Sequence, residues 1–115
     1  MVSEILFLLL VGHALADYPL QGDFIGKFKS WRVPPPPGMP RTTWAHLLTA
    51  HSLIHAGAVL LITGSLALAL CEFVAHWIID ALKCAGITGL HTDQLLHVAC
   101  KVAWWLAVIG VFNVQ

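Results

Sequence analysis

The chain has 115 residues, of which 58% are hydrophobic and only 10% are charged. Soluble domains carry roughly 25% charged residues, so the composition excludes an ordinary water-soluble globule. The six Lys and Arg residues are balanced by six Asp and Glu residues, which excludes the basic surface of a nucleic-acid-binding protein. The composition therefore predicts a small, single-domain integral membrane protein built from α-helices.

The first predicted membrane span begins at the N-terminus and ends near Gln21, where Pro19 should bend or end the helix. Residues 1–16 also resemble a signal peptide, because residues 14–16 have the A-x-A pattern of a cleavage site. This start has no Lys or Arg and contains Glu4, which favours a retained helix over a cleaved signal. Cleavage after residue 16 stays open as the alternative.

Residues 22–42 are predicted to form a proline-rich loop. The proline run 34–37 cannot be helical and is expected to be a stiff connector, with a ligand for a proline-binding partner as the alternative. The positive-inside rule places a loop this basic in the cytoplasm. Its basic residues are Lys27, Lys29, Arg32 and Arg41.

Three more spans are expected at residues 43–62, 65–83 and 92–112. The break at residues 63–65 reads Thr-Gly-Ser, which is typical of a tight turn between antiparallel helices. Residues 84–91 contain two glycines and are predicted to be a second cytoplasmic loop.

The last predicted helix has a marked beginning. Thr92 is placed to cap it, and Asp93 lies in its first turn, where the helix dipole favours an acid. Four spans with both long loops in the cytoplasm place the two termini outside. The sequence thus predicts an all-α, membrane-embedded four-helix bundle in the inner membrane.

Each predicted helix carries two polar residues four positions apart, on one helical face. Because the chain direction alternates, all of these pairs come to the cytoplasmic side at a similar depth. Ionisable residues inside a membrane usually face the bundle interior and mark a functional site. The pairs are His13 and Asp17, His51 and His55, His76 and Asp80, and Asp93 and His97.

Neutral imidazoles with carboxylates are the ligands that borderline divalent metals prefer, and helix bundles are known hosts for such sites. We expect these five histidines and three aspartates to hold one or two ions, with Zn²⁺ first and Mn²⁺ or Fe²⁺ as alternatives. A hydrogen-bonded polar core with a structural or proton-handling role is the other interpretation.

Four more polar residues are predicted to take part in catalysis. Gln21 and Gln94 are placed to orient metal ligands or a water molecule. Glu72 lies one turn deeper than His76 on the same face and is a candidate general base or a proton acceptor behind the site. The alternatives are a protonated carboxyl that is hydrogen-bonded near the turn at residues 63–65, and a partner of Lys101. Lys83, at the membrane edge, is placed to hold an anionic headgroup or to reach the interface as a helix-end lysine does.

Three motifs resemble a family of small phage and bacterial membrane proteins catalogued as domain of unknown function 3307. The resemblance covers nearly the whole chain and implies a retained first helix, but it supplies no function. The His/Asp pattern is also similar in kind to small membrane-bound metal-dependent hydrolases. The motifs are His13-x3-Asp17-Tyr18-x-Leu20-Gln21, His76-x2-Ile79-Asp80-x2-Lys83 and Asp93-Gln94-x2-His97.

Three functions follow as hypotheses. The first is a metal-dependent hydrolase acting on a lipid or lipid-linked ester or phosphate. The second is a proton or metal transporter, and the third is a non-enzymatic phage or bacterial protein that binds a host membrane protein and uses a structural metal. Small residues such as Gly57 and Ala67 allow helix packing within one chain or in an oligomer.

Overall fold

The computed structural model describes residues 2–113, with side chains described through residue 110, and over this range it contains helices and connecting loops but no strand. The predicted all-α class is therefore confirmed. The five helices are α1 (Val2–Asp17), α2 (Gly22–Phe28), α3 (Thr43–Thr63), α4 (Leu66–Cys84) and α5 (Leu90–Asn113).

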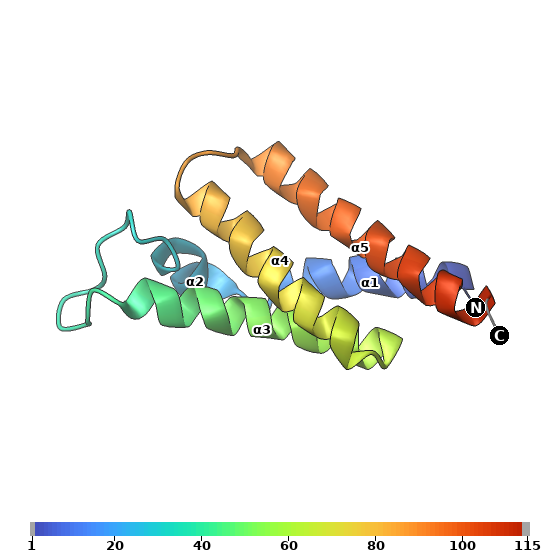
Figure 1. Cartoon of the computed structure of the whole chain (residues 1–115). Helices are drawn as coiled ribbons and strands as arrows, with labels where there is room; N and C mark the ends of the chain where they lie inside the picture. Colours follow the sequence, from blue (N-terminus) through green and yellow to red (C-terminus); the bar gives the residue numbers. More distant parts are fainter. Residues whose placement is uncertain (1, 114–115) are drawn as a thin grey trace.

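The four long helices pack in a closed order, because α1 contacts α3, α3 contacts α4, α4 contacts α5 and α5 contacts α1 again. The chain direction alternates from one long helix to the next (Figure 1). Residues 29–42 and the α4–α5 connection lie at one end, called the loop end here; the α3–α4 turn and the start of α1 lie at the other, called the terminal end (Figure 1).

The central hairpin agrees with the sequence prediction to within about one residue at each boundary. Gly64 ends α3 with a φ of 69°, a left-handed conformation that favours glycine. The next residue caps α4, since the Ser65 hydroxyl accepts a hydrogen bond from the backbone N–H of Leu68.

The prediction was wrong about the segment after α1. The helix ends at Asp17 rather than near Gln21, and residues 22–28, expected to be loop, form α2. The axes of α1 and α2 differ by 82°. Pro19 cannot continue the hydrogen-bond pattern of α1, and Gly22 redirects the chain through a φ of 66°.

The beginning of α5 also differs from the prediction. The helix begins at Leu90, two residues before the predicted cap, and the backbone N–H of Asp93 already donates to Gly89 O at 2.9 Å. Thr92 therefore lies exposed within the first turn and is not the cap. The second loop is correspondingly shorter than the predicted 84–91.

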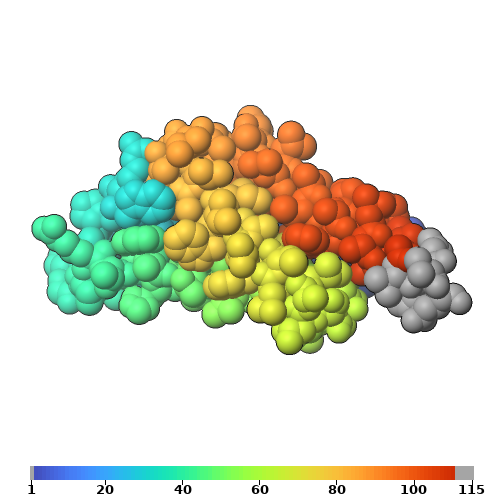
Figure 2. Space-filling view, in the orientation of Figure 1, coloured from blue at the N-terminus to red at the C-terminus, as the bar shows by residue number. Residues whose placement is uncertain are grey.

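The packing of side chains is inverted relative to a soluble protein. Among the described side chains, twelve of the twenty buried residues are polar or charged. Large apolar side chains instead lie exposed on the long helices, up to 88% for Leu61 on α3. Figure 2 shows the closed surface over α4 and α5, with the segment around residue 30 packed beside the α4–α5 connection.

By length and composition, α3 is the helix of the described chain that could cross a membrane unaided. The pair α1 and α2 also passes this test if the two helices are counted as one broken span.

Candidate metal centre

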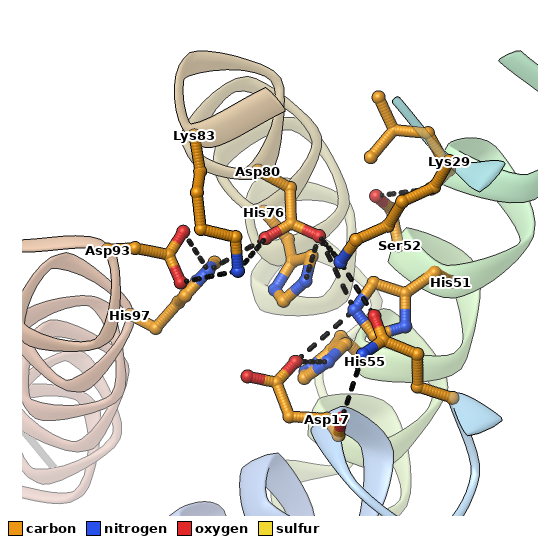
Figure 3. Close-up of polar contacts among 12 residues, drawn as sticks. Asp17, Lys29, His51, Ser52, His55, His76, Asp80, Lys83, Asp93 and His97 are labelled. Carbon is orange, nitrogen blue, oxygen red and sulfur yellow. Dashed lines mark hydrogen bonds and ion pairs between the residues drawn. The ribbon is translucent and has the colours of Figure 1, made fainter. Parts of the chain in front are cut away.

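The structure brings all eight predicted metal ligands together inside the loop-end half of the bundle. Each long helix contributes two of them, so the cluster depends on all four helices. Seven of the eight are buried, and the side chain of Asp17 is 9% exposed. Figure 3 shows most of these side chains pointing toward one another from α1, α3, α4 and α5.

The carboxylate of Asp17 is one centre of the cluster. Its Oδ1 lies 2.9 Å from His55 Nε2 and 3.2 Å from His51 Nε2. Its Oδ2 lies 3.4 Å from His13 Nε2 and accepts a hydrogen bond from Gln94 Nε2 at 3.0 Å. Gln94 therefore contacts a candidate ligand directly, as its predicted orienting role requires.

The carboxylate of Asp80 is the second centre (Figure 3). Its Oδ1 lies 3.3 Å from His97 Nε2, and its Oδ2 lies 3.5 Å from His51 Nε2 and 3.6 Å from His76 Nε2. His51 Nε2 thus lies between the two carboxylates and joins the two halves of the cluster.

The imidazole rings pack directly on one another. The rings of His55 and His76 are stacked with centroids 3.6 Å apart, and those of His76 and His97 are stacked at 4.2 Å. Several positive charges at these distances, away from water, would repel strongly. The packing therefore favours neutral rings, each of which keeps one nitrogen lone pair for a ligand.

Two overlapping groups of donor atoms could each hold an ion, with all donor atoms of a group within 4.8 Å of one another. The first contains Asp17, His51, His55 and His76, and the second contains His76, Asp80 and His97. Both ring nitrogens of His51 and of His76 are buried and lack a hydrogen-bond partner among the described residues. Buried polar atoms normally have partners, so one nitrogen of each ring, the Nε2 that lies beside the aspartate carboxylates, fits a bound cation.

His13 and Asp93 belong to neither donor group. His13 Nε2 contacts the side-chain oxygen of Gln94 at 3.1 Å, in addition to Asp17. Asp93 Oδ2 accepts from Lys83 Nζ at 3.1 Å, and its Oδ1 lies 3.4 Å from His97 Nε2. The structure therefore places both residues beside the donor groups, in contact with the ligands.

Lys29 is a site residue that the sequence analysis missed. Its side chain is buried, and its Nζ lies 2.5 Å from Asp80 Oδ2 and 2.6 Å from Gln21 Oε1. Nothing in the sequence distinguishes Lys29 from the other basic residues of its loop, which served only to predict the orientation of the chain in the membrane. The sharp bend between α1 and α2 is what returns it to the bundle.

Gln21 thus contacts the cluster in two ways: its Oε1 accepts from Lys29, and its Nε2 donates to the backbone oxygen of Asp17 at 3.0 Å rather than to a metal-binding side chain. The side chain of Lys83 bridges two acids, since its Nζ also lies 4.0 Å from Asp80 Oδ1. Both residues were predicted to serve catalysis, and both lie at the loop-end boundary of the cluster.

Glu72 connects the cluster to the deeper part of the bundle. Its carboxylate accepts hydrogen bonds from Lys101 Nζ at 2.5 Å and from Trp104 Nε1 at 2.6 Å. Its Oε1 also lies 3.4 Å from His76 Nδ1. The predicted pairing with Lys101 is confirmed.

The model of a protein family described as a protein of unknown function (DUF3307) matches residues 5–114 of this chain. No curated protein and no solved structure matches the chain significantly. The match covers nearly every residue of the bundle and all eight residues predicted to bind metal, so the chain belongs to the DUF3307 family.

Proposed function

We propose that the chain is a multi-pass inner-membrane protein in which α1 with α2, α3, α4 and α5 are the four spans. The inverted packing supports this, because lipid tolerates the exposed apolar side chains and the polar groups are enclosed inside the bundle. Helix α4 illustrates the point. Its acids Glu72 and Asp80 are both 1% exposed, whereas Leu70 and Ile78 on the same helix are 58% and 51% exposed.

The loop end faces the cytoplasm in this proposal, and the termini lie outside. Lys27, Arg32 and Arg41 are exposed at the loop end, as the positive-inside rule requires of a cytoplasmic segment.

The cluster binds a divalent metal in this proposal. One carboxylate and three imidazoles, from Asp17, His51, His55 and His76, are a donor set that suits Zn²⁺, and also Mn²⁺ or Fe²⁺. The second donor group shares His76 and offers a place for a second ion. The observation that carries the proposal is the pair of buried rings, His51 and His76, whose nitrogens face these carboxylates without hydrogen-bond partners.

The proposed activity is hydrolysis of a lipid or lipid-linked ester or phosphate. A bound divalent cation would supply polarisation of the substrate oxygen and lower the pKa of a water molecule to about 7. Hydrolysis forms a bond from the water oxygen to the carbonyl carbon or phosphorus. The ester oxygen leaves as an alcohol and takes a proton, so atoms and charge balance.

The residues around the donor groups have distinct places in this reaction. Gln94 fixes the carboxylate of Asp17 by a hydrogen bond, which sets the direction of its lone pairs. Glu72 faces Nδ1 of His76, which favours a proton on that nitrogen and a free lone pair on Nε2. Lys83 lies at the loop-end boundary, where it can hold a negative charge that develops on the substrate.

The first experiment measures metal content. The full chain is purified in mild detergent without chelator, and its metals are measured by mass spectrometry. We expect about one or two ions per chain, lost in His51→Ala and in His76→Ala because each removes a ligand. The matched control is His46→Ala, since His46 is an exposed histidine of α3 outside the cluster. Absence of metal after reconstitution with Zn²⁺ and Mn²⁺ would contradict the proposal.

The second experiment measures hydrolysis. The same protein is given lipid esters and lipid phosphates in micelles, and released fatty acid or inorganic phosphate is measured. We expect release that requires the metal and is absent in His51→Ala. A protein that retains stoichiometric metal and releases neither product would have a structural ion, which would favour the interpretation as a partner-binding protein.

Transport is less well supported by the interior of the bundle. Toward the terminal end, the polar interior stops at Glu72 and Lys101, and the buried residues beyond them are apolar among the described positions. These residues are Leu9 on α1, Val59 on α3, Ala69 on α4 and Val108 on α5. The buried side chains of this layer, over the part of the chain that the structure describes, therefore offer a proton or metal ion no polar partner.

A further inference from the structure

A cavity of about 370 Å³ opens at the loop end, where α2 and the segment after it approach the end of α4. Three lysines line it: Lys27 from α2, Lys29 from the following segment, and Lys83 from α4. Gln21 and Ser30 add an amide and a hydroxyl to the same wall. No Asp or Glu is among the lining residues, so the charged side chains that line the cavity are all lysines.

The cavity adjoins the candidate metal centre directly. Lys29 lines the cavity and also lies 2.5 Å from Asp80 Oδ2 through its Nζ. Lys83 lines it too and lies 3.1 Å from Asp93 Oδ2. A ligand that contacts these two lysines is therefore one side chain away from the metal-binding carboxylates.

The charges at this boundary change when the centre takes up a metal. Without metal, the carboxylates of Asp17, Asp80 and Asp93 exceed Lys29 and Lys83 by one negative charge. One divalent cation turns this excess into one positive charge. It also competes with Lys29 for the oxygen of Asp80, and a lysine that loses its carboxylate partner needs another anion.

We propose that this cavity binds the phosphate group of a phosphate ester, which names the substrate class of the hydrolase proposed above and rests on that proposal. Lysines bind phosphate as point charges, and the tetrahedral phosphate offers acceptor oxygens to donors that converge from several directions. A carboxylic ester is uncharged and would leave the lysines of the metal-loaded site without an anion.

A lipid is one source of such a phosphate, and a free phosphate ester is the other. Phe24 on α2 and Ile87 after α4 are exposed apolar residues close in sequence to the cavity lining, at 45% and 72% exposure. These side chains would contact the hydrocarbon of a lipid whose headgroup enters the cavity. The test below distinguishes the two sources.

The test uses native mass spectrometry of the full chain in detergent, with phosphatidic acid and diacylglycerol of the same acyl chains at equal concentration. We expect the Zn²⁺-loaded protein to retain phosphatidic acid in preference. Each of Lys27→Gln and Lys83→Gln should lower that preference by about fivefold, the effect of one lysine near an anionic lipid. Lys27 is exposed and lies outside the metal centre, so Lys27→Gln should leave the fold intact and a change in lipid preference would report on the cavity.

Arg41→Gln is the matched control, because Arg41 is an exposed cation of the same loop end, in segment 29–42, and lines a different cavity. It should leave the preference unchanged. Equal retention of the two lipids by the wild type, or an equal loss in Arg41→Gln and Lys27→Gln, would overturn the proposal. Inorganic phosphate at matched concentration identifies the source: displacement of phosphatidic acid indicates free phosphate esters, and persistence indicates a lipid.

Metal content measured in the same samples separates this inference from the proposed function. A lysine-dependent preference for phosphatidic acid in a protein that binds no metal would support the phosphate cavity and contradict the proposed hydrolase. Metal binding without that preference would support the metal centre and contradict the phosphate cavity. If both hold, loading with Zn²⁺ should raise the affinity for phosphatidic acid by about 25-fold, since two positive charges are added beside the cavity.

Discussion

The two halves of the bundle differ in their interiors while sharing the same apolar exterior. The loop-end half buries histidines, aspartates and a lysine, whereas the terminal half buries residues such as Leu9 and Val59. Glu72 and Lys101 form the boundary between the two. In the proposed membrane setting, the surrounding lipid favours an apolar exterior in both halves, whereas the interior of each half follows from its role.

The halves should also be stabilised by different forces. In lipid, burying an apolar side chain between helices gains little from the hydrophobic effect, so the terminal half depends on close van der Waals packing. The loop-end half depends on hydrogen bonds and charge pairs at low dielectric, which are strong when complete and costly when one partner is missing. Mutations can test this difference, from the largest expected effect to the smallest.

Mutations at the boundary between the two halves should lower the stability of the bundle the most. Glu72→Gln leaves Lys101 buried without a counter-charge, and we expect the free energy of unfolding in detergent to fall by about 3–5 kcal/mol. Denaturant titration followed by circular dichroism measures this. The double variant Glu72→Leu/Lys101→Met removes both charges and should recover much of the loss. A double variant as unstable as the single one would show that the ion pair is not the cause.

Metal should stabilise the loop-end half selectively. Free Zn²⁺ at about 100 times its dissociation constant should raise the free energy of unfolding by about 2.7 kcal/mol, because only the folded chain assembles the donor groups. Thermal unfolding with and without chelator measures the shift. His55→Ala should lose it, because His55 belongs to the first donor group. His46→Ala should keep it, and an equal shift in both variants would place the ion elsewhere.

Packing should dominate in the terminal half. Leu9 is 1% exposed, and Leu9→Ala should cost about 2 kcal/mol or more through the cavity it leaves. Leu61 is 88% exposed, and Leu61→Ala should change the free energy of unfolding by less than about 0.5 kcal/mol. The two are measured by the same denaturant titration. Similar costs at both positions would mean that the exterior of the bundle is also packed against protein.

The smallest effect should come from a helix cap in the terminal half. Ser65→Ala removes the hydroxyl that accepts from the N–H of Leu68, at a cost of about 1 kcal/mol. Thr92→Ala is its control, since Thr92 has the sequence features of a cap but lies inside the first turn of α5. Thermal unfolding of the two variants compares them, and a larger effect at Thr92 would contradict the observed beginning of α5.

The sequence predicted what repeats along a helix. Spacing of four residues placed His51 with His55 and His76 with Asp80 on single faces, and alternating chain direction then brought the faces together. These inferences need only the helical period and the positions of the turns. For the same reason, the boundaries of α3 and α4 were predicted to within about one residue.

The sequence did not predict what depends on the direction of a bend. Pro19 and Gly22 indicate that α1 must end, but the angle between α1 and α2 follows from their packing against the rest of the bundle. Lys29 reaches Asp80 only because of that angle, and the two residues are 51 positions apart in sequence. A contact of this kind leaves no periodic signal in the chain.

The contact from Gln94 to Asp17 has a consequence for the order of biosynthesis. The two residues are 77 positions apart, and Gln94 lies near the start of the last helix to be synthesised. In the proposed membrane topology, Asp17, His51 and His55 would enter the bilayer well before Gln94, and Lys29 would precede its partner Asp80. The nascent chain therefore carries incompletely paired polar groups until α5 closes the bundle, and a chain truncated ahead of α5 would expose them to lipid or to the insertion machinery.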